Sequence, residues 1–136
     1  MKPKIKFPKY KNNKEIEKFF LSKGFKELVK ISKKMNRKVE YQNYHGMRDK
    51  NPYQPDLRQL HRLYQYVILN KRTTILEFGS GWSSLIFLIS LNETKSSNLN
   101  FVKKYLRRQN PFELFIVENK KKFSTITTKR IRNFLK

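Results

Sequence analysis

The chain has 136 residues, enough for one hydrophobic core, and it contains no cysteine. Disulfides, thiolate zinc sites and cysteine nucleophiles are therefore excluded. The two histidines leave little for a histidine-based metal site, so no metal is expected. The longest apolar run, residues 85–89, is far shorter than the roughly 18–20 residues that a membrane span needs. No secretion signal follows the basic N-terminus, and a soluble cytoplasmic protein is expected.

The net charge of +22, from 32 lysines and arginines against 10 acids, would attract anions such as nucleic acid or phosphorylated substrates. Lysines outnumber arginines 23 to 9 and are spread along the whole chain. A sequence-specific nucleic-acid reader more often concentrates arginines among aromatic residues. We therefore expect most cations, including those of residues 103–108 and 120–132, to form solvated faces. Nucleic acid bound through the basic surface is the alternative.

Residues 1–55 predict a basic N-terminal arm, two short helices and a loop. Prolines and lysines in residues 1–12 favour an extended arm. A first helix begins at Asn13 and ends near Gly24, since its apolar residues have helical spacing. These residues are Ile16, Phe19 and Phe20. A second helix follows, with one side formed by Phe25, Leu28, Val29, Ser32 and Met35.

The loop expected at residues 36–55 is rich in turn formers and amphipathic rings. Its rings belong to Tyr41, Tyr44, His45 and Tyr53. Such rings either line a ligand site or pack onto a core. His45 is the better functional candidate of the two histidines, because His61 lies beside the apolar stripe of a predicted helix and is expected to be packed.

Residues 56–136 predict alternating helices and strands. Pro55 and Asp56 suit the start of a helix, whose buried stripe is Leu57, Leu60, Tyr64, Val67 and Ile68. The remaining predicted elements follow in chain order. They are a strand at 73–78, an apolar helix from Ser83 to about Leu91, a polar loop at 92–98, a short helix around 101–106 ended by Asn110-Pro111, a strand at 112–118 and a helix at 123–134.

The order strand, Gly-x-Gly, helix, strand, acid is typical of nucleotide-type cofactor sites. Gly79 allows the tight turn that leaves the first strand, and Gly81 lets the backbone approach a ligand closely. Ser83 and Ser84 are expected to cap the next helix, whose free N–H groups point toward the site. Glu118 follows the second strand, where a carboxylate can accept both hydroxyls of a ribose.

Residues 75–84, Ile-Leu-Glu-Phe-Gly-Ser-Gly-Trp-Ser-Ser, resemble the first motif of class I S-adenosylmethionine-dependent methyltransferases. That motif is acid-x-Gly-x-Gly, and Glu77, Gly79 and Gly81 match it. Residues 116–119 are similar to the family's second strand and its terminal acid, and the resemblance covers roughly residues 56–134. A nicotinamide fingerprint, Gly-x-Gly-x-x-Gly, fails because Ser84 stands at its last glycine.

The resemblance implies an α/β fold, namely a Rossmann-like methyltransferase half-domain over residues 56–136, with parallel strands and flanking helices. The α-helical region 1–55 precedes it. The cofactor would be S-adenosyl-L-methionine. Glu77 would hold its methionine amino group, directly or through water, and Glu118 its ribose hydroxyls. The cofactor would also be lined by the loop and the start of the helix, at Gly79, Ser80, Gly81 and Ser83.

A full member of the family has more strands than the two predicted here, so we expect a truncated or split product, with a short standalone variant as the alternative. The methyl acceptor is unknown, and no catalytic residue is assigned. An open sheet edge would favour self-association. The alternative function is a small basic nucleic-acid-binding protein on a degenerate Rossmann scaffold.

Overall fold

The computed structural model describes residues 4–34, 55–108 and 111–136. These residues form a mixed fold of five helices and a two-stranded parallel sheet. They fall into two compact units, one of residues 11–59 and one of residues 1–10 with 60–136. The predicted loop residues Tyr41, Tyr44, His45 and Tyr53 lie outside the described residues, as does Met35.

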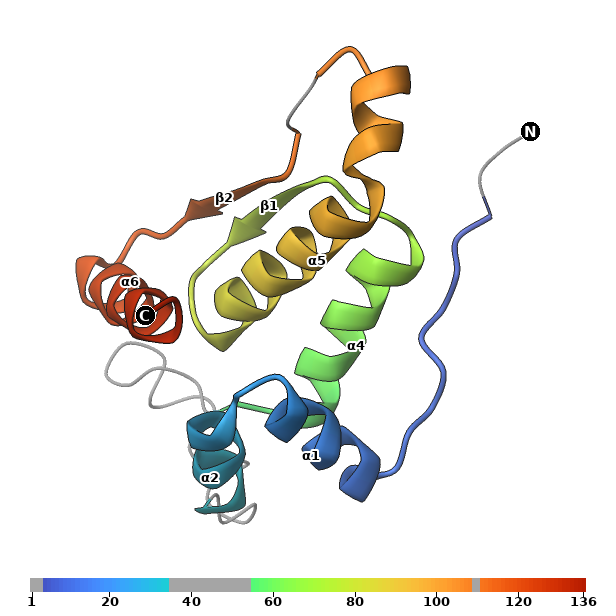
Figure 1. Cartoon of the computed structure of the whole chain (residues 1–136). Helices are drawn as coiled ribbons and strands as arrows, with labels where there is room; N and C mark the ends of the chain where they lie inside the picture. The colour runs from blue at the N-terminus through green and yellow to red at the C-terminus, as the bar shows by residue number, and fades with distance from the viewer. Residues whose placement is uncertain (1–3, 35–54, 109–110) are drawn as a thin grey trace. The chain divides into compact units, whose positions relative to one another are not determined.

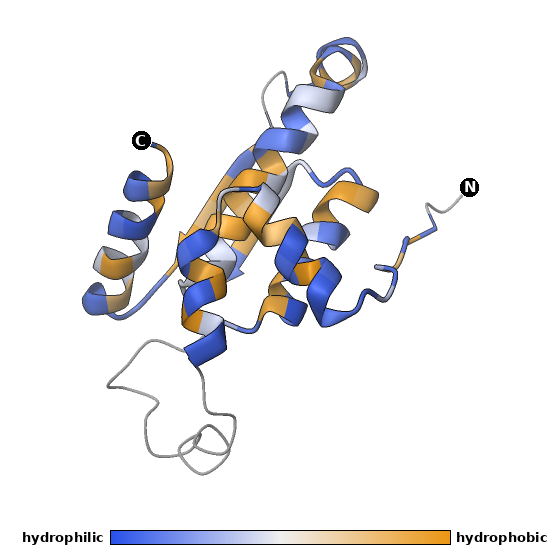
Figure 2. Cartoon of the chain, turned by 60° about the horizontal axis from the view of Figure 1, so that its bottom comes forward, coloured by the Kyte–Doolittle hydropathy of each residue, from blue (hydrophilic) through white to orange (hydrophobic). Residues whose placement is uncertain are grey.

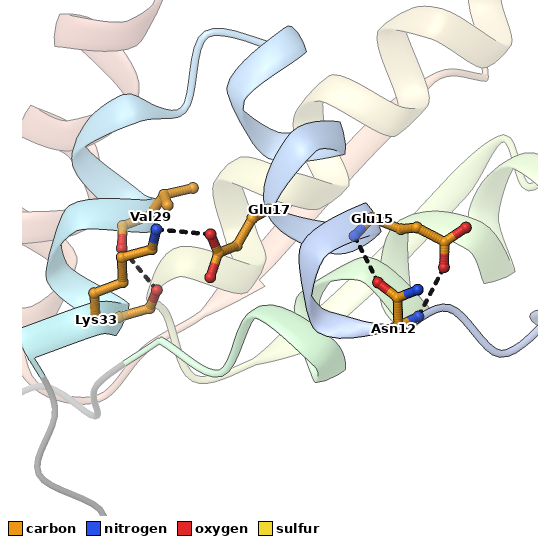
Figure 3. A network of polar contacts seen from close by, with 6 residues as sticks. Asn12, Glu15, Glu17, Val29 and Lys33 are labelled. Carbon is orange, nitrogen blue, oxygen red and sulfur yellow. Dashed lines mark hydrogen bonds and ion pairs between the residues drawn. The ribbon is translucent and has the colours of Figure 1, made fainter.

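The unit of residues 11–59 contains the two short helices that the sequence predicts, α1 (Asn13–Ser22) and α2 (Lys26–Lys34). Asn12 and Glu15 form a reciprocal capping box at the start of α1 (Figure 3). Gly24, with a φ of +86°, turns the chain between the helices. The two helices bury a small apolar core made of Ile16, Phe20, Phe25, Leu28 and Val29. Lys33 of α2 also pairs with Glu17 of α1 at 2.7 Å (Figure 3).

The other unit is built on two parallel strands, β1 (Thr74–Phe78) and β2 (Glu113–Val117), paired in register from Thr74 with Glu113 to Phe78 with Val117. Helix α5 (Trp82–Tyr105) connects them and packs on both strands (Figure 1). Parallel strands need such a crossover connection, because a hairpin can join only antiparallel strands. Helix α6 (Lys121–Phe134) follows β2 and packs on α5.

Helix α4 (Leu57–Leu69) leads into β1, and Asp56 caps it by accepting hydrogen bonds from the N–H groups of Arg58 and Gln59. Its buried residues are Leu60, His61, Tyr64 and Val67, so His61 is packed, as the sequence predicts. The described part of the N-terminal arm contains neither helix nor strand. It is fixed to the end of α4 by two hydrogen bonds between the backbone of Lys6 and the side chain of Asn70, at 2.8 and 2.9 Å.

The prediction of a polar loop at residues 92–98 is wrong, because α5 continues unbroken through that segment. Its polar side chains hydrogen-bond carbonyls of the same helix, as Thr94 does to Ser90 at 2.8 Å and Asn98 does to Thr94 at 2.9 Å. No glycine or proline interrupts residues 82–105. Figure 2 shows the change of polarity along the helix, from an apolar first half to a polar second half.

The sheet has one face on α5 and one exposed face. The exposed face carries Leu76, Phe78, Phe115 and Val117, with 49–79% of each residue accessible to solvent. Among the described residues, neither strand has a further strand at its outer edge. Among those same residues, no helix is both long and apolar enough to cross a membrane.

Candidate functional site

The candidate site begins with a sharp turn at the carboxyl end of β1. Gly79 has a φ of +93°, a left-handed conformation that residues with a side chain rarely adopt. Its N–H donates a hydrogen bond of 2.8 Å to the carbonyl of Val117, so the turn stays attached to the end of β2. The glycine therefore brings the loop at 79–81 beside the residues that follow β2.

Glu118, directly after β2, is held by one hydrogen bond from the loop after β1 and one from the chain after β2. The N–H of Lys120 donates to its Oε1 at 2.8 Å, and the hydroxyl of Ser80 donates to its Oε2 at 2.9 Å. These donors stabilise the ionised carboxylate and lower its pKa, with the Lys120 N–H the largest cause and the Ser80 hydroxyl the next. Glu118 is therefore a fixed anion beside the glycine loop.

Glu77, the fourth residue of β1, lies on the face of the sheet that packs against α5. Its carboxylate accepts hydrogen bonds from the hydroxyls of Ser83 at 2.5 Å and Ser84 at 2.6 Å. The Ser84 hydroxyl in turn accepts a hydrogen bond of 3.1 Å from the N–H of Gly81. Glu77 thus ties the strand, the glycine loop and the first turn of α5 together.

Open space lies beside the backbone of Gly81. A Cβ added there would meet no atom within 4 Å outside the neighbouring residues. The φ of Gly81 is 175°, which is extended backbone that any residue adopts. The turn itself therefore does not require a glycine at position 81, but the glycine leaves space beside the backbone.

Trp82, the bulky residue of the motif, is directed at α6. Its ring lies under the guanidinium carbon of Arg130, 3.9 Å from the ring centroid, and its exposed fraction is 9%. A cation over an aromatic face is favourable and most so when desolvated. The contact fixes the start of α5 against α6.

The structure brings together all six residues that the sequence assigns to the site, Glu77, Gly79, Ser80, Gly81, Ser83 and Glu118. The helix cap agrees with the prediction only in part, because Gly81, not a serine, occupies the N-cap position of α5. Both serine hydroxyls donate to Glu77, and the Ser84 hydroxyl also accepts the N–H of Gly81, as the side chain at the third position of a capping box does. Ser84, fully buried, is a site residue that the prediction treated only as a cap. In the sequence, Ser84 lies seven residues after Glu77, and that spacing alone does not indicate a contact. Only the fold brings the two side chains together.

The unit of residues 11–59 has a surface feature of its own. A surface hollow beside the first turn of α1 is lined by Asn12, Asn13, Lys14, Glu15 and Lys18, all in the unit of residues 11–59. Among the residues that the structure describes, no group of three histidine, aspartate or glutamate side chains is arranged to hold a metal ion.

Comparisons with known proteins give no match for this chain, whether to a protein-family model, to a curated protein or to a solved structure.

Proposed function

We propose that residues 56–136 form the cofactor-binding part of an S-adenosylmethionine-dependent methyltransferase, on a Rossmann-like half-domain. The observation that carries the proposal is the 2.9 Å hydrogen bond between Ser80 and Glu118. It joins the glycine loop after β1 to the acid after β2, so both parts of the motif meet at one sheet edge. In open parallel sheets, ligands bind outside the carboxyl ends of the strands.

The chemistry of the residues at this edge fits such a cofactor. The Glu118 carboxylate, whose ionised form is stabilised by its hydrogen-bond donors, would accept hydrogen bonds from the ribose hydroxyls. Glu77 accepts two serine hydroxyls, and a carboxylate has about four lone-pair sites, so capacity remains for the amino group of the methionine moiety. The space at Gly81 would let the cofactor approach the backbone.

The chain's own residues would bind and orient the cofactor. When bound, S-adenosylmethionine supplies an activated methyl group, whose transfer depends mainly on proximity and orientation. Ser80 and the Lys120 N–H would keep the Glu118 carboxylate in place before the cofactor binds, which reduces the ordering cost of binding.

The proposal is tested by calorimetric titration of the full chain with S-adenosylmethionine and S-adenosylhomocysteine. Wild type is expected to bind both, and Glu118→Ala to bind about ten- to a hundredfold more weakly, since hydrogen bonds to a charged group are lost. Glu113→Ala is the matched control, because it removes the same charge at the opposite end of β2 and should bind like wild type. Absence of binding at millimolar cofactor, or tighter binding of a nicotinamide dinucleotide, would contradict the proposal.

A further inference from the structure

The last turns of α5 present two exposed aromatic rings side by side. Phe101 and Tyr105 are 60% and 61% exposed, and their ring centroids are 4.7 Å apart with an interplanar angle of 41°. Residues four apart lie on the same face of a helix, which explains the pairing. Val102, 2% exposed, anchors the same turn against the protein, so the two rings point outward from a fixed helix.

Exposed cations lie close to this ring pair along the chain. Lys103, Lys104, Arg107 and Arg108 are all exposed, and the ammonium of Lys104 lies 5.2 Å from the centroid of the Tyr105 ring. Arg108 is held by an ion pair with Glu113 at the start of β2. The surrounding sequence adds to the field, because residues 95–136 contain twelve lysines and arginines and two glutamates. The surface thus combines a strong positive potential with accessible aromatic faces.

This surface is separate from the candidate cofactor site. The site lies at the N-terminal end of α5, at Gly81, whereas the ring pair lies in its last two turns. A helix of 24 residues is about 36 Å long at 1.5 Å per residue. Figures 1 and 2 both show the last turns of α5 projecting beyond the two strands.

We propose that Phe101 and Tyr105, with Lys104 beside them and the arginines at 107 and 108 just after the helix, form a binding surface for single-stranded nucleic acid. Unpaired bases stack on aromatic rings, while lysines and arginines neutralise the phosphates. A duplex keeps its bases stacked inside and cannot use the rings in this way. The binding tolerates different sequences, because every base has a face that can stack.

A membrane surface fits these residues less well. Insertion at a lipid interface needs a continuous apolar helix face. The polar residues Asn92, Ser96, Ser97 and Asn100 are exposed along this half of α5, so the ring pair and the adjacent exposed Leu106 do not continue into an apolar helix face. The potential and the rings together therefore favour a polyanion with stackable bases.

The experiment measures anisotropy of fluorescein-labelled 12-nucleotide oligothymidylate and oligouridylate at fixed salt, with the full chain. The double variant Phe101→Leu with Tyr105→Leu keeps helix-forming, apolar side chains but removes both rings. It is expected to bind at least tenfold more weakly, since each stacked ring contributes roughly one order of magnitude in affinity. Tyr10→Ala, which removes an 81% exposed ring between Lys9 and Lys11 on the arm, is the matched control and should bind like wild type.

Two further arms separate stacking from charge. An abasic strand of the same length has phosphates but no bases to stack. Its affinity for wild type should be no higher than the affinity of the intact strand for the double variant. Lys104→Gln with Arg107→Gln should lower the dependence of affinity on salt, whereas the ring variant should leave that dependence unchanged. Equal affinity of wild type and the ring variant for the oligonucleotides would overturn the proposal. So would binding of anionic vesicles that depends on the two rings while binding of oligonucleotides does not.

Discussion

Glu118 is the residue on which the candidate site depends most, because its Oε2 accepts the hydroxyl of Ser80 in the glycine loop while its Oε1 accepts the N–H of Lys120. The sequence predicts that Glu118 follows a strand, but the register between the two strands determines which residues Glu118 contacts. Phe78 pairs with Val117, so the residues after each strand emerge at the same edge. The hydrogen bond to Ser80 follows from that register.

The Glu118 carboxyl should titrate below its ordinary pKa, and Ser80→Ala should raise that pKa by removing one of the donors that stabilise the anion. A depressed folded pKa means that the carboxylate's contribution to stability is present above the unfolded pKa. It is lost as the pH falls through the folded value. Carbon-detected NMR titration of wild type and Ser80→Ala measures this. Equal Glu118 pKa values in the two proteins would contradict the assigned hydrogen bond.

The two glycines of the motif should respond differently to alanine. Gly79→Ala should lower the free energy of unfolding by about 1–2 kcal/mol, because alanine is strained at a φ of +93°. Gly81→Ala should cost less, because its backbone is extended and the added methyl group meets open space. Instead it should weaken cofactor binding by filling that space.

Urea unfolding of the two variants gives the comparison, and Gly24→Ala is the control for strain. Gly24 has a similar φ of +86° with open space around it, but lies in the unit of residues 11–59. Its variant should lose stability like Gly79→Ala while cofactor binding stays unchanged. A larger loss of stability for Gly81→Ala than for Gly79→Ala would refute this division of roles.

At the scale of elements, the strands and short helices followed from local pattern, whereas the second half of α5 did not. Residues 92–98 have the polar composition of a loop, and they lack the hydrophobic periodicity that would indicate a helix. Its helical state depends on side-chain bonds to the helix's own carbonyls and on a contact with α4. The latter involves residues 29 positions apart, which a local pattern cannot contain.

That contact is the hydrogen bond from the hydroxyl of Tyr64 in α4 to the carboxylate of Glu93 in α5. Burial, followed by the interaction with Glu93, raises the pKa of Tyr64. Tyr64→Phe should lower the free energy of unfolding by about 1–2 kcal/mol, because a charge-assisted hydrogen bond is lost at a buried ring.

Urea unfolding of Tyr64→Phe is best compared with Tyr66→Phe, which alters a half-buried tyrosine two residues along the same helix. The Tyr66 variant should be closer to wild type. If Tyr64→Phe were as stable as wild type, the hydroxyl would have no part in holding α4 to α5.

For the whole molecule, the exposed sheet face and the high net charge have opposite effects on self-association of the chain. Leu76, Phe78, Phe115 and Val117 form an apolar surface that favours association of copies. The outer edges of the two strands, which no other described strand covers, add to this. The net charge of +22 opposes it by mutual repulsion. Salt screens the repulsion and leaves the apolar surface in place.

We therefore expect self-association that strengthens as the salt concentration rises, measured by sedimentation velocity. Phe78→Lys, at the most exposed residue of the face, should keep the chain monomeric over the same salt range. Phe7→Lys is the control, because it changes a 71% exposed phenylalanine on the arm. A monomer at every salt concentration, or equal effects of both variants, would show that the sheet face plays no part.

NMR mapping of S-adenosylhomocysteine on the isotope-labelled chain measures whether the loop at 79–81 and Glu118 form a cofactor site. We expect the backbone signals of residues 77–84 and 117–120 to shift together as the ligand is added, and the signals of Phe101 and Tyr105 to stay unchanged. No shifts at millimolar ligand, or shifts confined to the last turns of α5, would contradict the proposed cofactor site.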